Sequence, residues 1–174
     1  MTKMNIRKEL LKYQVQSRAQ ALAIAEYATS SNETFKDLID CFLSDDTRLA
    51  QRAAWSVSWA ARKKPDVIQP YIGLLVNQLE RTDVHNAIIR NSLRVLEDIE
   101  IPEIYHGPLL NTCFNFILKR ETAIAVKAFS LHVLFNLTKF YPEIKNELKL
   151  VIRENIEFET PAFRSRGNKI LAKL

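Results

Sequence analysis

The chain has 174 residues, of which 47% are hydrophobic and 26% are charged, and its 25 basic and 20 acidic side chains give a net charge of +5. A chain of this length and composition can bury a core without disulfides or metals, so we expect a single domain over residues 1–174. Only three glycines are present, far apart in the sequence, which excludes Gly-rich phosphate loops, dinucleotide-binding turns and a β-rich fold.

Charged side chains such as Lys3, Arg7 and Lys12 interrupt the apolar positions near the amino terminus, so we expect no signal peptide. The longest uncharged runs, 67–79 and 104–118, are shorter than the roughly 18 apolar residues that a membrane span requires. Cys41 and Cys113 lie among apolar neighbours, which indicates reduced core thiols rather than a disulfide framework. The sequence therefore predicts a cytoplasmic protein that does not associate with membranes.

Apolar residues recur at helical spacing along almost the whole chain, and strand-like alternation is absent. Asp, Thr and Pro residues separate the helical segments, for example at 44–47, 64–66 and 159–161. The predicted fold class is all-α. In chain order, about ten helices are expected over residues 4–12, 14–30, 33–43, 47–63, 67–81, 84–99, 103–119, 122–140, 143–155 and 161–173.

Alternate helices are copies of one another. Four basic residues recur at intervals of 37 or 38 residues: Arg52, Arg90, Lys127 and Arg164. On the intervening helices, three apolar residues recur every 38 residues: Ile72, Leu110 and Leu148. A fixed period of this length indicates stacked helical hairpins of 37 to 38 residues.

The cleanest copy is Val-Lys-Ala-Phe-Ser-Leu at 126–131, where an apolar–basic pair follows an acidic turn and precedes a small and then a large apolar residue. This pattern resembles the first helix of HEAT and armadillo-type repeats. The resemblance extends from about Gln14 to Leu174 and implies a right-handed α-solenoid of about four and a half hairpins. It implies approximate units at 1–45 (an N-terminal cap and the first repeat), 46–82, 83–120 and 121–158, and a C-terminal capping helix at 159–174.

The recurrent basic residues form a column along such a solenoid. In one interpretation the column is structural, because each cation pairs with an acid or a carbonyl of the neighbouring turn and keeps the repeats in register. In the other, the column binds phosphate or carboxylate ligands. The residue types suit both roles. The members are Arg52, Arg90, Lys127 and Arg164, with Arg18 in the preceding hairpin.

A second column lies on the solvent-facing stripe of the other helices, which the resemblance places on the concave surface. Its members are spaced by four residues, so each helix presents them on one face. We expect a protein or peptide partner to bind in this groove, with asparagines hydrogen-bonded to its backbone as in armadillo-type proteins; a solvated face is the alternative. The candidate partner-binding residues are Gln69, Gly73, Asn77, Asn111, Asn115, Lys145, Lys149 and Arg153.

Trp55 and Trp59 raise one enzymatic interpretation. HEAT-like DNA glycosylases for alkylated purines hold a damaged base with aromatic side chains and an Asp in a basic groove. No acid accompanies the two tryptophans here, since Asp66 is the nearest one downstream, and large aromatics at helical spacing are typical of a core. The three histidines lack the spacing of a metal site, and neither cysteine has a nearby His. We therefore predict no catalytic residue, no cofactor and no metal.

The sequence thus predicts a non-enzymatic interaction or scaffold module, monomeric or weakly oligomeric, that binds a protein or peptide of unspecified identity. The alternative is a nucleic-acid-binding protein, related to DNA alkylation repair, which would suit the pI of about 9.2 and the basic residues near the carboxyl end. The salt dependence of binding distinguishes the two alternatives, because contacts to several phosphates make the affinity fall steeply as the salt concentration is raised.

Overall fold

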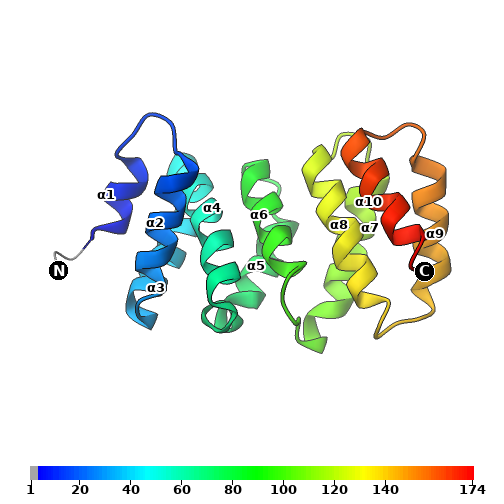
Figure 1. Ribbon diagram of the computed structural model, residues 1–174, viewed down its shortest axis with the longest axis horizontal. Coiled ribbons are helices and arrows are strands. Elements are labelled where there is room, and N and C mark those ends of the chain that lie inside the picture. Colours follow the sequence, from blue (N-terminus) through cyan, green and yellow to red (C-terminus); the bar gives the residue numbers. More distant parts are fainter. Residues whose placement is uncertain (1–3) are drawn as a thin grey trace. The chain divides into compact units, whose positions relative to one another are not determined.

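The computed structural model describes residues 4–174, and over this range the chain forms helices and no strands (Figure 1). The predicted all-α class and the predicted number of helices are confirmed. In the described range the α-helices are α1 (Ile6–Leu11), α2 (Arg18–Ala28), α3 (Asn32–Phe42), α4 (Thr47–Lys63), α5 (Ile72–Glu80), α6 (Asn86–Leu96), α7 (His106–Leu118), α8 (Ile124–Leu137), α9 (Ile144–Asn155) and α10 (Pro161–Leu171). Short 3-10 turns precede α5 at Pro65–Val67 and Gln69–Tyr71, and α7 at Glu103–Tyr105.

Side-chain caps determine where several helices begin. Ser17, Ser31 and Asp46 each accept a hydrogen bond from a backbone N–H in the first turn of α2, α3 and α4. The helix expected from residue 14 therefore begins only at Arg18, after its cap. The helix expected from residue 67 begins at Ile72, because the chain first makes a 3-10 turn around Pro70, which has no N–H to donate.

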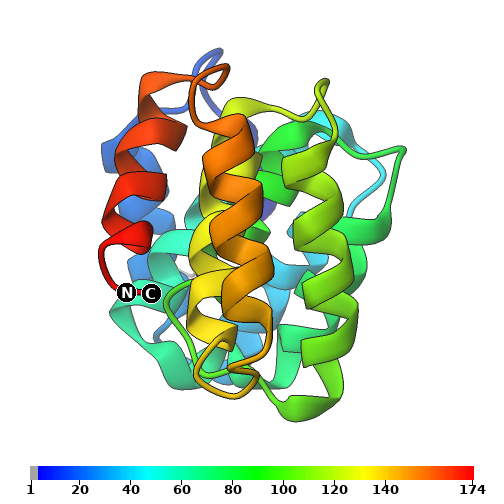
Figure 2. The ribbon, with the colours of Figure 1, turned by 90° about the vertical axis from the view of Figure 1, so that its right-hand side faces the viewer.

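The chain divides into two compact units, Met1–Asp98 (unit 1) and Ile99–Leu174 (unit 2). In unit 1, α4 lies between α2 and α6 and also packs on α3, so it is the central helix (Figure 1). In unit 2, α8 lies between α7 and α10 (Figure 2), and α9 contacts both α8 and α10. No helix in the described part of the chain has the length and apolar character to cross a bilayer.

Each unit has its own apolar core. In unit 1 the fully buried side chains include Phe35, Leu49 and Leu93, which come from α3, α4 and α6. In unit 2, Leu134 of α8 and Phe163 of α10 are buried completely. Each such side chain contributes about 1.5–3 kcal/mol through the removal of its apolar surface from water. Burial of this kind, rather than helix propensity, stabilises helices as short as these.

The thiol of Cys113 lies in the core of unit 2 with no exposed surface. Burial raises the pKa of Cys113 to about 12 from an ordinary value of 9.0. Above pH 9 the unfolded chain therefore loses a proton that the folded chain retains, so raising the pH lowers stability. Urea unfolding at pH 8 and pH 10 should show that the wild type loses about 1.4 kcal/mol more than Cys113→Ala. Equal losses of stability in the wild type and in Cys113→Ala would contradict a raised pKa of the Cys113 thiol.

Candidate partner-binding surface

The exposed stripe of α4 carries both tryptophans of the chain. Trp55 and Trp59 lie one helical turn apart and are partly exposed, because the small side chains on the opposite side of α4, including Ala53 and Ala60, pack into the core. The two tryptophans, whose spacing is typical of a core, are thus half-buried at its edge. Helix α4 is flanked by α2 and α6, and it is the side turned away from α3 that remains open to solvent in unit 1.

Three guanidinium groups surround the ring of Trp59. The Cζ atoms of Arg18 on α2 and Arg94 on α6 lie 5.0 Å and 4.9 Å from the ring centroid, and that of Arg62 on α4 lies 5.9 Å from it. Since α2 and α6 lie on opposite sides of α4 (Figure 1), Arg18 and Arg94 reach the ring from two different neighbours. Cation–π attraction of about 0.5–1 kcal/mol per exposed contact favours this arrangement.

Within residues 4–174, Arg62 is the one of these three cations that is joined to carboxylates by a hydrogen bond or a close ion pair. Arg62 donates a hydrogen bond of 2.8 Å from Nε to Asp98 and lies 3.9 Å from the carboxylate of Glu97. Within residues 4–174, no hydrogen bond or close ion pair joins Arg18 or Arg94 to a carboxylate. Burial, and then the charge of Arg62, lower the pKa of Arg94, while the charges of Glu97 and Asp98 act in the opposite direction.

A hollow of about 450 Å³ adjoins Trp55 in unit 1, between the α1–α2 connection, α4 and α6. Its lining combines three arginines, Arg48, Arg52 and Arg90, with Trp55, three glutamines and a valine. Arg52 is buried and donates hydrogen bonds to the backbone carbonyl oxygens of Leu10, in the last turn of α1, and of Tyr13 and Gln14, in the α1–α2 connection. Arg48 donates to the same two carbonyls of the connection. Arg90 is exposed and makes no hydrogen bond or ion pair with any residue of 4–174.

Apart from Arg62, which pairs with carboxylates, the exposed or partly exposed cations and rings of this region form one group within unit 1. Trp55 and Trp59 lie one turn apart on α4, and the arginines come from α2, α4 and α6. We call this group the arginine–tryptophan surface. It comprises Arg18, Arg48, Trp55, Trp59, Arg90 and Arg94.

A family model of the HEAT repeat domain matches residues 6–174, which is almost the whole chain. The chain belongs to the HEAT repeat family. The resemblance that the repeated basic residues indicated is thereby confirmed. HEAT repeats generally mediate protein–protein interaction. No curated protein and no solved structure matches this chain.

The four basic residues of the HEAT period do not share one environment. Arg52 and Lys127 are buried, and they bind backbone carbonyls and the carboxylate of Glu159, respectively. Arg90 and Arg164 are exposed. Arg164 makes no side-chain hydrogen bond or ion pair within the described residues. Two of the four thus have the contacts that the structural interpretation requires, while Arg90 lines the hollow of the arginine–tryptophan surface.

The predicted polar stripe is divided between the two units. Gln69 lies in the 3-10 turn before α5, and Gly73 and Asn77 lie on α5, all in unit 1. Asparagines 111 and 115 lie on α7, and the cations lie on α9, all in unit 2. All eight retain at least partial exposure. Gly73, Lys145 and Lys149 are partly exposed, and the exposed ones are Gln69, Asn77, Asn111, Asn115 and Arg153.

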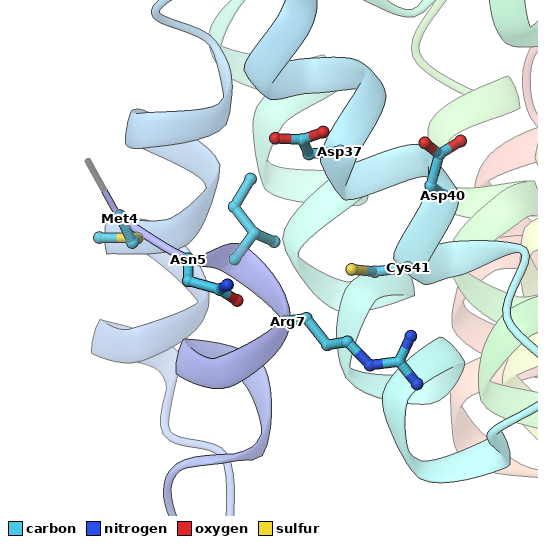
Figure 3. A pocket seen from close by; sticks show the side chains of 7 residues that line it. Met4, Asn5, Arg7, Asp37, Asp40 and Cys41 are labelled. Carbon is cyan, nitrogen blue, oxygen red and sulfur yellow. The ribbon is translucent and has the colours of Figure 1, made fainter.

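Two further cavities lie elsewhere in this HEAT chain. One of about 480 Å³ lies between α1 and α3, where Arg7, Asp37, Asp40 and Cys41 line it (Figure 3). Burial raises the pKa of the Cys41 thiol, which makes it a weak nucleophile, and Lys36 binds Asp40 at 2.8 Å. Among residues 4–174, no cluster of three or more His, Cys, Asp or Glu side chains could hold a metal ion.

The other cavity, of about 470 Å³, lies in unit 2 between α8 and α10. Phe135, Arg166 and Lys173 are among its lining residues. The guanidinium of Arg166 lies 4.8 Å from the ring centroid of Phe129, and the Nζ atom of Lys173 lies 5.9 Å from that of Phe135. Cations stacked on aromatic rings therefore occur in both units, but the group in unit 1 contains more arginines.

Sequence reasoning named only part of the arginine–tryptophan surface. It singled out Arg18 and Arg90 by their period and the two tryptophans by their spacing, but it did not join them. Arg94 follows Arg90 by one helical turn, which is a local signal that α6 presents two cations on one face. That signal, together with the pair of tryptophans, could have indicated a surface with both charge and aromatic character.

Proposed function

We propose that this HEAT chain is a non-enzymatic interaction module that binds a protein partner through the arginine–tryptophan surface. The general role of HEAT repeats supports the first part of the proposal. One observation carries the second: Arg18 and Arg94 reach the partly exposed ring of Trp59 without a hydrogen bond to a carboxylate within residues 4–174, and Arg90 lines the hollow beside Trp55. Trp and Arg are the side chains that contribute most often to the energetically dominant centre of protein interfaces.

The chemistry of the surface favours recognition over catalysis. A general acid or base needs a titratable group such as a carboxylate or an imidazole within reach of the substrate. The hollow beside Trp55 is lined instead by guanidinium groups, carboxamides and the side chain of Val15. No carboxylate is among the residues that line this hollow, and those of Glu97 and Asp98 face Arg62. The two buried free thiols, Cys41 and Cys113, suit a reducing compartment, so the proposed setting of the module is the cytoplasm.

The test is a pull-down of the tagged chain from its native lysate, with and without nuclease. We expect a discrete protein that survives nuclease treatment and is lost with the double variant Arg18→Gln/Arg94→Gln. The matched control is Lys36→Gln/Arg81→Gln, which removes the same charge from α3 and from the end of α5, where each cation pairs with an acid. A partner lost equally with both variants would contradict the proposed site, and nucleic acid lost with nuclease would contradict the proposed class of partner.

The same pull-down also tests the residues of the predicted polar stripe as an alternative binding site. The variant Asn77→Asp/Asn115→Asp places negative charge on α5 and α7 and leaves the arginine–tryptophan surface intact. We expect this variant to retain the partner. Loss of the partner here, with retention by Arg18→Gln/Arg94→Gln, would move the binding site to the polar stripe.

A further inference from the structure

The arginine–tryptophan surface is short. It begins with Arg48 at the start of α4 and ends near Arg62, which Asp98 and Glu97 already neutralise. These two arginines are 14 positions apart on one α-helix, which corresponds to about 21 Å. An extended peptide of about six residues covers that length. The dimensions therefore suit a short linear segment of a partner.

The arginines at Trp59 are preorganised for binding carboxylates. A guanidinium group placed over an aromatic ring keeps its N–H donors in its own plane, where they remain free to form two parallel hydrogen bonds to a carboxylate. Arg18 and Arg94 are held over Trp59 before any ligand arrives. Holding long side chains in advance lowers the entropy that binding would otherwise lose.

We propose that the arginine–tryptophan surface binds a short acidic peptide segment, whose Asp or Glu carboxylates bind Arg18 and Arg94 at Trp59 and Arg90 at the hollow. This inference rests on the proposed function and adds the chemical class of the partner segment. The side-chain amides of Gln14 and Gln51 line the same hollow and make no hydrogen bond within residues 4–174, so they can bind the backbone of the peptide.

Three observations favour a peptide over a nucleic acid. Proteins that bind single strands stack bases on open aromatic faces, whereas guanidinium groups already lie over the ring of Trp59. Glu97 and Asp98 bring two carboxylates to one guanidinium, that of Arg62, so negative charge at this end of the surface would repel a phosphate backbone that continued past it. Residues 1–98 together carry 14 basic and 12 acidic side chains, so the positive charge is a local feature of unit 1.

The test uses a defined probe, a fluorescein-labelled twelve-residue peptide in which Glu alternates with Ser. Because both tryptophans of the chain lie on this surface, their intrinsic emission reports binding at the proposed place, and fluorescence anisotropy of the labelled peptide gives the affinity. We expect the peptide to change the tryptophan emission. Arg18→Gln/Arg94→Gln should weaken binding at least about tenfold, and the control Lys36→Gln/Arg81→Gln less than about twofold.

A second variant separates charge from geometry. Arg18→Lys/Arg94→Lys keeps both charges but cannot form the planar two-point hydrogen bonds of a guanidinium group. We expect it to lose most of the affinity that the Gln variant loses. Circular dichroism and the urea midpoint of every variant show whether it remains folded; both arginines are at least partly exposed, so these substitutions should leave the core intact.

A peptide that leaves tryptophan emission unchanged, or that binds the Gln variant as tightly as the wild type, would overturn the inference. A twelve-nucleotide oligothymidine that binds more tightly than the peptide and displaces it would also overturn the inference, in favour of nucleic acid. The two proposals can fail separately. If the lysate partner still depends on Arg18 and Arg94 while the acidic peptide does not bind, the partner class is wrong and the interaction module stands.

Discussion

Replacing Arg52 by alanine should destabilise unit 1 by about 3 kcal/mol. The side chain is only 7% exposed, and its guanidinium donates hydrogen bonds of 2.7, 2.8 and 2.6 Å to the carbonyl oxygens of Leu10, Tyr13 and Gln14. Its removal leaves these carbonyls with fewer partners and opens a space between α4 and the α1–α2 connection. Urea unfolding measures the loss as a lower midpoint with an unchanged slope.

Arg48 supplies a matched control for Arg52. It lies one turn earlier on α4 and donates to two of the same carbonyls, those of Tyr13 and Gln14, at 3.0 and 3.3 Å, but its side chain is exposed. Water can replace an exposed donor, so Arg48→Ala should lower stability by less than about 1 kcal/mol. If the two alanine variants lost the same stability, the burial of Arg52 would not explain its contribution to stability.

The helices and their repetition could be predicted from sequence because both depend on local patterns of residues. Apolar spacing marks the buried side of each helix, and residues such as Ser31 and Asp46 mark where helices begin. Two starts lie markedly later than expected: α2 begins after its Ser17 cap, and α5 begins late because Pro70 cannot donate the hydrogen bond that an α-helix needs inside its second turn. The general role in protein interaction followed from the repeat family.

The binding surface could be predicted only in part, because its members come from three helices. Spacing alone does not distinguish a tryptophan in the core from one such as Trp59, which remains partly exposed on the open side of α4. Arg62 is three residues from Trp59 on the same helix, but Arg18 and Arg94 stand 41 residues before it and 35 after it, and no local pattern joins them to it. Their convergence depends on α2 and α6 both packing against α4.

The repeated basic residues also show what sequence alone does not predict, namely which members of a repeat are buried. Arg52 and Arg90 are 38 residues apart and of the same type, yet one is buried and the other exposed. What distinguishes them is the partner: Arg52 donates to carbonyl oxygens at the end of α1 and in the α1–α2 connection, about 40 residues earlier in the chain. A repeat in sequence therefore identifies equivalent helices, but the burial of each member depends on which backbone groups the fold brings to it.

In unit 2, breaking the ion pair between Lys127 and Glu159 should lower stability by as much as replacing Arg52 by alanine does in unit 1. The two side chains are 5% and 14% exposed. Removing either partner leaves a charge with little access to water, so Lys127→Met or Glu159→Gln should lower stability by about 3 kcal/mol in urea unfolding at pH 7. The loss concerns the junction between α8 and the start of α10, since Glu159 directly precedes the Thr160 cap of α10.

The double variant Lys127→Met/Glu159→Leu decides whether the loss comes from the unpaired charge or from the pair itself. An apolar pair of similar volume involves no desolvated charge, so the double variant should be more stable than either single variant and within about 1 kcal/mol of the wild type. If the double variant loses as much as the sum of the two single ones, the two residues act independently and the pair does not hold α8 to α10. As an exposed comparison, Lys36→Gln, which breaks the pair with Asp40, should leave the unfolding midpoint unchanged.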